Sequence, residues 1–123
     1  MAFVIVWEFM LRTGMQEQFE EAYGDCGAWA SLFRSDPAYI RTELIQDVCD
    51  ASRYLTLDFW ESEAAYEAFR ERRKNEYRDI DAKCEQMTEA EREVGKFRVC
   101  RTEPPQAALA WTAEGGCPYD TPT

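Results

Sequence analysis

Two carboxylates, Glu8 and Asp58, stand in stretches where apolar and polar residues alternate, VWEF and RYLTLDFW. A carboxylate that folding buries among aromatic side chains has a raised pKa and can act as a general base. The chain has no histidine, which removes the commonest general base and the commonest metal ligand. The sequence therefore favours acid–base chemistry by Asp58 or Glu8, and it predicts no metal site.

Several side chains can donate hydrogen bonds to a developing oxyanion: the Trp60 indole, the Tyr66 hydroxyl, Arg41 and Arg98. Trp60 ends the alternating stretch and Tyr66 lies in the segment that follows, so the two are expected to face each other at a corner of the chain. Catalysis is therefore assigned to Trp60, Tyr66, Asp58 and Glu8. The residues expected to bind a small substrate are Thr56, Arg41, Arg98, Tyr23, Trp29 and Phe69.

Each of these residues also has a purely structural interpretation. Asp58 and Glu8 can pair with arginines across neighbouring strands, and such charge pairs commonly stabilise sheets. Trp60 and Tyr66 can serve as packing area, with their polar tips bonded to the backbone. The sequence leaves both interpretations open.

Four strands are predicted from alternation with period two, over residues 3–12, 39–46, 54–60 and 96–101. The connection DVCDAS between the second and third strands is too short for a parallel crossover, so an antiparallel hairpin is expected there.

Helices are predicted between these strands. Thr13 and Gln16 have capping-box spacing, and Gly24 ends the first helix. A second short helix follows Asp25. Ser62 is expected to cap a third helix, because a serine directly before an apolar helical pattern is a typical N-cap.

The helical region after Ser62 is expected to continue to about residue 93, with an interruption near Lys74. Thr88 and Glu91 repeat the capping-box spacing, which predicts a separate short helix that ends at Gly95.

Strand–helix–strand repeated twice is typical of an α+β fold, the ferredoxin-like split βαβ with a four-stranded antiparallel sheet. Helices should cover one sheet face, and an open apolar face should be covered by a second copy in a homodimer. The residues assigned to that apolar face are Phe3, Ile5, Trp7, Phe9, Leu55, Leu57, Phe59, Phe97 and Val99. The residues assigned to the helix-covered face are Glu8, Arg41, Glu43, Thr56, Asp58, Lys96 and Arg98.

The 123 residues suffice for one domain, expected over residues 1–102. Residues 103–123 are rich in proline and glycine and are expected to wrap along their own domain or a partner subunit. The five cysteines include no CxxC pair, and free buried thiols are predicted.

The formal charge of −10 should repel phosphate backbones and anionic membranes, so neither nucleic acid nor membrane is an expected partner. The N-terminal MAFVIVWEFMLR has no signal-peptide pattern. A cytoplasmic location is therefore expected.

Over roughly residues 3–101 the sequence resembles the antibiotic biosynthesis monooxygenase (ABM) family of the dimeric α+β barrel superfamily. The segments that carry the resemblance are VWEF with LRTGMQEQFEEAYG, PAYIRTEL and, above all, RYLTLDFWESEAAYEAF. The resemblance implies a dimer whose sheets pack face to face as an α+β barrel, with small substrates held between sheet and helices. Trp60 and Tyr66 match the family's pocket tryptophan and tyrosine.

The resemblance also implies oxygenation of phenols or anthrones to quinones with no cofactor. Such chemistry needs a substrate that gives an electron to oxygen as a phenolate or enolate, so the protein's task is to remove a proton and stabilise the anion. Thr56 departs from the pattern, because quinone-forming members carry an asparagine there. The helical histidine of haem-degrading relatives is missing.

Three functions remain open at this point. The first is a cofactor-independent monooxygenase that oxidises a small electron-rich aromatic, such as a phenol, an anthrone or a polyketide-like compound. The second is a non-catalytic ligand-binding or structural dimer, since a fold does not define an activity. The third is an isomerase or cyclase of an aromatic polyketide.

Overall fold

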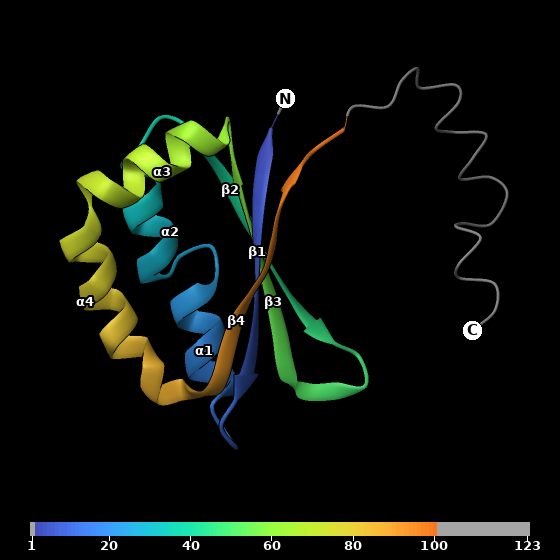
Figure 1. Cartoon of the computed structure of the whole chain (residues 1–123). Coiled ribbons are helices and arrows are strands. Elements are labelled where there is room, and N and C mark those ends of the chain that lie inside the picture. Colours follow the sequence, from blue (N-terminus) through green and yellow to red (C-terminus); the bar gives the residue numbers. More distant parts are fainter. Residues whose placement is uncertain (1, 101–123) are drawn as a thin grey trace, which may run out of the picture.

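A computed structural model describes residues 2–100, which form a four-stranded antiparallel sheet with helices on one face (Figure 1). The strands are β1 (Phe3–Leu11), β2 (Tyr39–Asp47), β3 (Asp50–Trp60) and β4 (Thr88–Arg98), in the sheet order β2-β3-β1-β4. The helices are α1 (Gln16–Tyr23), α2 (Ala28–Phe33), α3 (Glu63–Arg72), α4 (Lys74–Cys84) and the short 3₁₀ helix η1 (Glu85–Met87). This is the predicted ferredoxin-like α+β fold. The predicted tail, residues 103–123, lies outside the described residues.

The hairpin predicted between β2 and β3 is confirmed, with a tighter turn than expected. Asp47 pairs with Asp50, so the turn itself is Val48 and Cys49. The Asp47 carboxylate accepts the backbone N–H of Cys49 at 2.7 Å, and the Asp50 carboxylate accepts that of Ser52 at 2.9 Å. These side-chain bonds satisfy turn backbone groups and let the strands pair almost to the tip.

Of the three predicted N-terminal helix caps, at Thr13, Ser62 and Thr88, one is correct, and Gly24 ends α1 as predicted. The Ser62 hydroxyl accepts the backbone N–H of Ala65 at 3.1 Å, which caps α3 as expected. The capping box at Thr13 is wrong, because α1 begins after Met15 with no side-chain cap. Gly14, whose φ is +81°, makes the turn between β1 and α1.

The short helix predicted for residues 88–95 is also wrong, because these residues belong to β4. They pair with β1 from Thr88 opposite Leu11 to Arg98 opposite Phe3, with bulges that adjust the register. A complete ladder along the central strand outweighs the helical propensity of a glutamate-rich segment.

The assignment of sheet faces is wrong on two strands. Glu8 of β1 and Arg41 and Glu43 of β2 lie on the open face, because they pair with Leu55, Phe59 and Leu57. The odd residues of β1 pair with the even residues of β3, for example Phe3 with Trp60 and Ile5 with Asp58, so they share the helix-covered face. Phe3, Ile5 and Phe9 therefore belong to the main core and not to the open face. The prediction failed because both parities of β1 are rich in apolar residues, so alternation alone did not identify the buried side.

The open face is built from the other parity. Its apolar residues, by their register, are Val4, Val6, Met10, Ile45, Leu55, Leu57, Phe59 and Phe97. Phe97 and Ile45 are exposed, whereas Val4 and Val6 on the central strand are buried between their neighbours. The open sheet face thus carries apolar residues as predicted, but β1 contributes Val4, Val6 and Met10 to it and not its odd-numbered residues.

Four cysteines lie within the described residues, and all four thiols are free. Only Cys84 is buried; Cys26, Cys49 and Cys100 are exposed, so the prediction of buried thiols holds for one of the four. Between residues 2 and 100, no helix has the length and apolar character needed to cross a membrane.

Candidate functional site

A cavity of about 140 Å³ lies between the sheet and the helices. For comparison, an engineered apolar cavity of about 150 Å³ holds benzene. The space therefore suits one aromatic ring. Its lining residues are Trp7, Phe9, Tyr23, Trp29, Phe33, Thr42, Thr56, Asp58, Arg70, Tyr77, Asp81 and Glu91.

Asp58 is a buried carboxylate that lines this cavity. Its position in β3 opposite Ile5 turns the carboxylate toward the helices, where it is only 8% exposed. Burial raises the pKa of Asp58 to about 6, against a hydrogen bond from Thr42 that acts in the opposite direction. The ionised carboxylate is thus poorly solvated and ready to accept a proton.

A short hydrogen-bond chain supports Asp58. The Thr42 hydroxyl donates to the Asp58 carboxylate at 2.7 Å, and the Tyr39 hydroxyl lies 2.8 Å from the same Thr42 oxygen. Because the single Thr42 proton is given to Asp58, Tyr39 is the donor of the second bond. β2 thus holds one carboxylate oxygen in place.

Arg70 brings a positive charge to the same cavity. Its guanidinium lies 4.1 Å from the centre of the Tyr77 ring and donates to the Tyr66 hydroxyl at 3.0 Å. These contacts from α3 and α4 restrict the arginine to one orientation. Arg70 is the only cation among the residues that line the cavity, so it is the natural partner for an anion formed there.

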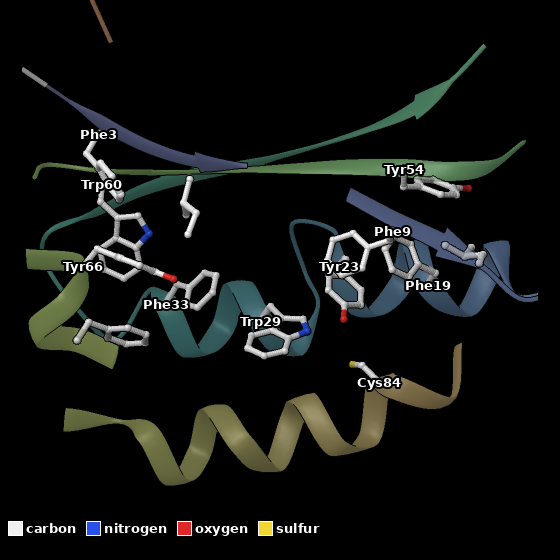
Figure 2. Close-up of a cluster of buried hydrophobic side chains, with 13 residues drawn as sticks. Phe3, Phe9, Phe19, Tyr23, Trp29, Phe33, Tyr54, Trp60, Tyr66 and Cys84 are labelled. Carbon is white, nitrogen blue, oxygen red and sulfur yellow. The ribbon is translucent and has the colours of Figure 1, made fainter. Parts of the chain in front are cut away.

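Trp60, Tyr66 and Phe69 belong to the core and are not among the residues that line the cavity. Figure 2 shows Trp60 and Tyr66 packed against each other between the sheet and the helices. The Trp60 ring is fully buried, 5.5 Å from Tyr66 and 4.9 Å from Phe69. Within residues 2–100, the Trp60 N–H has no hydrogen-bond partner. The Tyr66 hydroxyl contacts the cavity only indirectly, by accepting a hydrogen bond from Arg70. Direct catalytic roles for Trp60 and Tyr66 stay predictions.

The structure separates Glu8 from Asp58, because Glu8 lies on the open face. Arg53 and Arg92 each donate to its carboxylate at 2.6 Å. The hydrogen bond from Arg53, followed by that from Arg92, lowers the pKa of Glu8. A base needs the opposite change, so the assignment of Glu8 to catalysis is corrected to a cross-strand ion pair.

Two predicted substrate-binding arginines also lie away from the cavity. Arg41 is on the open face, where it pairs with Glu43 at 2.9 Å and lies 4.0 Å from the centre of the Phe59 ring. Arg98 is exposed at the end of β4. Neither one lines the cavity. The single-residue bulge of β2 after Tyr39 is what places Arg41 on the outer side.

Four predicted site residues do meet at the cavity: Asp58, Thr56, Tyr23 and Trp29. Sequence reasoning missed Arg70, Tyr77 and Thr42. Arg70 and Tyr77 follow Tyr66 at four and eleven residues along the helical region, which is one side of a continuous helix. That spacing could have identified Arg70 and Tyr77 as site residues. The charged residues 70–74, however, are typical of a solvent-exposed helix face, which favours a structural interpretation of Arg70.

The fold and the cavity define an α+β protein in which a buried carboxylate and an arginine line one cavity between the sheet and the helices. The model of the family described as antibiotic biosynthesis monooxygenase matches residues 2–83. The chain belongs to this family. No curated protein matches the sequence.

Solved structures show the same fold. SnoaB, a cofactor-independent oxygenase from Streptomyces nogalater, matches with a TM-score of 0.67 and 16% identity, over 84% of this chain and 97% of that protein. A conserved protein from Methanosarcina mazei Go1 matches with a TM-score of 0.60 and 13% identity, over 79% of this chain and 91% of that protein. At these identities the likeness concerns the fold alone.

Proposed function

We propose that this protein is a cofactor-independent monooxygenase that oxidises a phenol of one aromatic ring. The observation that carries the proposal is Asp58, a buried carboxylate with a pKa of about 6 in an aromatic cavity whose lining includes Arg70. Family membership and the fold shared with SnoaB, itself an oxygenase, support this class of reaction.

In the first step, Asp58 accepts the proton of the phenol hydroxyl. An ordinary phenol has a pKa of about 10, so transfer to a base of pKa about 6 costs about 5 kcal/mol in the absence of other effects. The Arg70 guanidinium and the Thr56 hydroxyl offset this cost by stabilising the phenolate, since both line the same low-dielectric space.

In the second step, the phenolate transfers electrons to dioxygen. One oxygen atom adds to the ring carbon, and the C–H bond at that carbon and the O–O bond break. The second oxygen atom leaves as water with the ring proton and the proton that Asp58 holds. Phenol and dioxygen thus give quinone and water, with all four electrons supplied by the substrate. The protein's residues bind and deprotonate the phenol and shield the resulting phenolate from water.

The alternatives make different demands on the same residues. An isomerase or cyclase needs the Asp58 base and the Arg70 cation but consumes no oxygen. A non-catalytic binding protein needs neither an ionised Asp58 nor oxygen. Oxygen uptake that depends on Asp58 therefore separates the three functions.

We further propose that the protein is a homodimer through the open sheet face. Leu55, Leu57 and Phe59 form a row of partly buried apolar side chains on β3, and Phe97 extends it on β4. Such a surface on a single protein of this size favours a partner.

The test of the proposed function is oxygen uptake with simple phenols as a function of pH. Because Asp58 must be ionised to accept a proton, kcat/KM should increase about tenfold per pH unit below pH 6 and level off above it, as its pKa of about 6 requires. Quinone and consumed oxygen should be equimolar. Binding of phenols without oxygen uptake at any pH would exclude the oxygenase and favour the alternatives.

Replacing Arg70 by Gln should lower kcat by about 100-fold, the usual cost of losing one preorganised oxyanion contact. The Tyr66 and Tyr77 rings remain, so the fold should be retained. Arg78→Gln is the matched control, since Arg78 is an exposed arginine of α4 that does not line the cavity. Equal oxygen-uptake rates for the two variants would contradict the role given to Arg70.

A further inference from the structure

The bulge of β2 determines which residue lies beside Asp58. The register of β2 against β3 shifts by one residue just before it reaches this carboxylate. Without the shift, Arg41 would be the residue opposite Asp58; with it, Thr42 takes that place. An arginine there would lower the pKa of the carboxylate, as two arginines do for Glu8 on the open face. Bulges that redirect a side chain in this way are common next to active sites.

The same bulge brings Tyr39 to the side of Thr42. Residues three positions apart point to opposite faces of a regular strand, yet the Tyr39 hydroxyl lies 2.8 Å from the Thr42 hydroxyl. Tyr39 is half-buried, and its ring meets the edge of Trp60 with the ring centres 5.4 Å apart. This packing holds the Tyr39 hydroxyl in place. Since Tyr39 donates to the Thr42 oxygen, Thr42 turns its own proton toward Asp58.

The two carboxylate oxygens of Asp58 have different surroundings. Oδ1 accepts the Thr42 hydroxyl at 2.7 Å, and within residues 2–100 this is the only hydrogen bond to the carboxylate. Oδ2 is not among the polar atoms of this part of the chain that are both sealed from solvent and unpartnered. Oδ2 is therefore the oxygen that is open to the cavity.

Other titratable and charged residues lie close to Asp58 or line its cavity. They are Tyr23 of α1, Tyr39 of β2, Tyr66 and Arg70 of α3, Tyr77 and Asp81 of α4, and Glu91 of β4. Burial raises the pKa of all four tyrosines above the ordinary value of about 10, so they stay neutral where Asp58 titrates. The pKa of Asp58 itself is raised by burial and lowered by the Thr42 hydrogen bond.

We propose that Thr42 and Tyr39 are positioning residues of the proposed reaction: they hold Oδ1 of Asp58, so that Oδ2 accepts the substrate proton, and they keep the carboxylate ionised at neutral pH. The positioning role rests on the proposed function, whereas the ionisation of Asp58 is measurable without any substrate. The competing interpretation is that the Thr42–Asp58 bond only joins β2 to β3, as cross-strand pairs commonly do.

The first test is a carbon-13 NMR titration of the Asp58 carboxyl group in the full-length protein, with the signal assigned by its loss in Asp58→Asn. Thr42→Val removes the donor at nearly constant side-chain volume. The titration midpoint should therefore increase by about one pH unit, because hydrogen bonds to ionised groups are the stronger class. Thr42→Ser keeps the hydroxyl and should keep the wild-type midpoint. Tyr39→Phe should increase the midpoint by about half as much, since Thr42 loses the donor that orients it.

The second test is oxygen uptake with a simple phenol at pH 8, where most of Asp58 is ionised in every variant. Thr42→Val should lower kcat about tenfold and change KM less than about twofold, because a misplaced base slows the proton transfer. Thr42→Ser should restore kcat. Thr88→Val is the matched control, because Thr88 is a buried strand threonine that does not line the cavity. It should change neither kcat nor the Asp58 midpoint.

An Asp58 midpoint that stays the same in Thr42→Val would overturn the proposal, since a bond that only joins two strands would lower stability and leave the midpoint in place. An equal increase in Thr42→Ser would also overturn it, because the hydroxyl would then not be the cause. If Thr42→Val is poorly folded, Tyr39→Phe provides the test, and an unchanged midpoint there counts against the proposal.

The two readouts also separate this inference from the proposed function. The expected NMR midpoints in a protein that takes up no oxygen would exclude the monooxygenase and leave the control of Asp58 ionisation standing. Oxygen uptake in wild type, with the same Asp58 midpoint in all variants, would keep the monooxygenase and exclude the role given to Thr42 and Tyr39.

Discussion

Replacing Asp58 by Asn is expected to lower oxygen uptake by 100-fold or more and, at the same time, to stabilise the fold at pH 8. Activity falls because an amide accepts no proton, and general-base catalysis contributes about 10²–10⁴ in rate. Stability increases because the variant no longer holds a poorly solvated charge inside the protein. A group kept for catalysis at a cost in stability gives this combination.

The pH dependence has a definite sign. The pKa of Asp58 is about 6 in the folded chain. The unfolded chain has the ordinary aspartate pKa of 3.8. Between these values the folded chain binds the proton more tightly, so the free energy of unfolding decreases as pH rises through this range. The difference in pKa corresponds to about 3 kcal/mol. Asp58→Asn should therefore be more stable than wild type by about 1–3 kcal/mol at pH 8, and the advantage should vanish below pH 4.

Urea unfolding at pH 8 and near pH 4 measures this effect. Asp47→Asn is a matched control of opposite sign. The backbone N–H of Cys49, followed by Arg53, lowers the pKa of Asp47, so its ionised form stabilises the fold and the amide should lower stability at pH 8. If Asp58→Asn is less stable than wild type at pH 8, the carboxylate is a structural group and the catalytic assignment loses its basis.

Replacing Leu57 by Arg is expected to convert the protein from a dimer into a monomer. Leu57 lies at the middle of the open sheet face, opposite Val6 on β1 and Glu43 on β2. Burying an unpaired guanidinium in an apolar interface costs several kcal/mol, enough to weaken association about 1,000-fold or more. The fold of each subunit should survive, because in the monomer the arginine reaches water.

Light scattering after size-exclusion chromatography measures the mass directly. Wild type should have twice the chain mass of 14.3 kDa and Leu57→Arg the chain mass itself. Ala68→Arg is the control, because Ala68 is exposed on α3, on the helix side of the sheet. A wild-type monomer, or a variant that remains dimeric, would show that the open face is not the interface.

Part of the candidate site was predictable because it depends on one strand. Within β3, alternation places Thr56, Asp58 and Trp60 on a common side, and the Ser62 cap identifies where the strand turns into a helix. Both signals are local, so they can be recognised in the sequence without knowledge of any other element. The arrangement around Asp58 was not predictable in this way. Thr42 and Arg70 reach the cavity from β2 and α3.

Local patterns in the chain determined the ferredoxin-like plan, the β2–β3 hairpin and the carboxylate of Asp58. Tertiary structure decided the rest. Both parities of β1 are apolar, so only pairing with β3 and packing against the helices selected the buried side and moved Glu8 to the opposite face. Residues 88–95 have a helical composition, and their place beside β1 made them a strand. Burial and pairing are properties of elements brought together, and they raised the pKa of Asp58 and lowered that of Glu8.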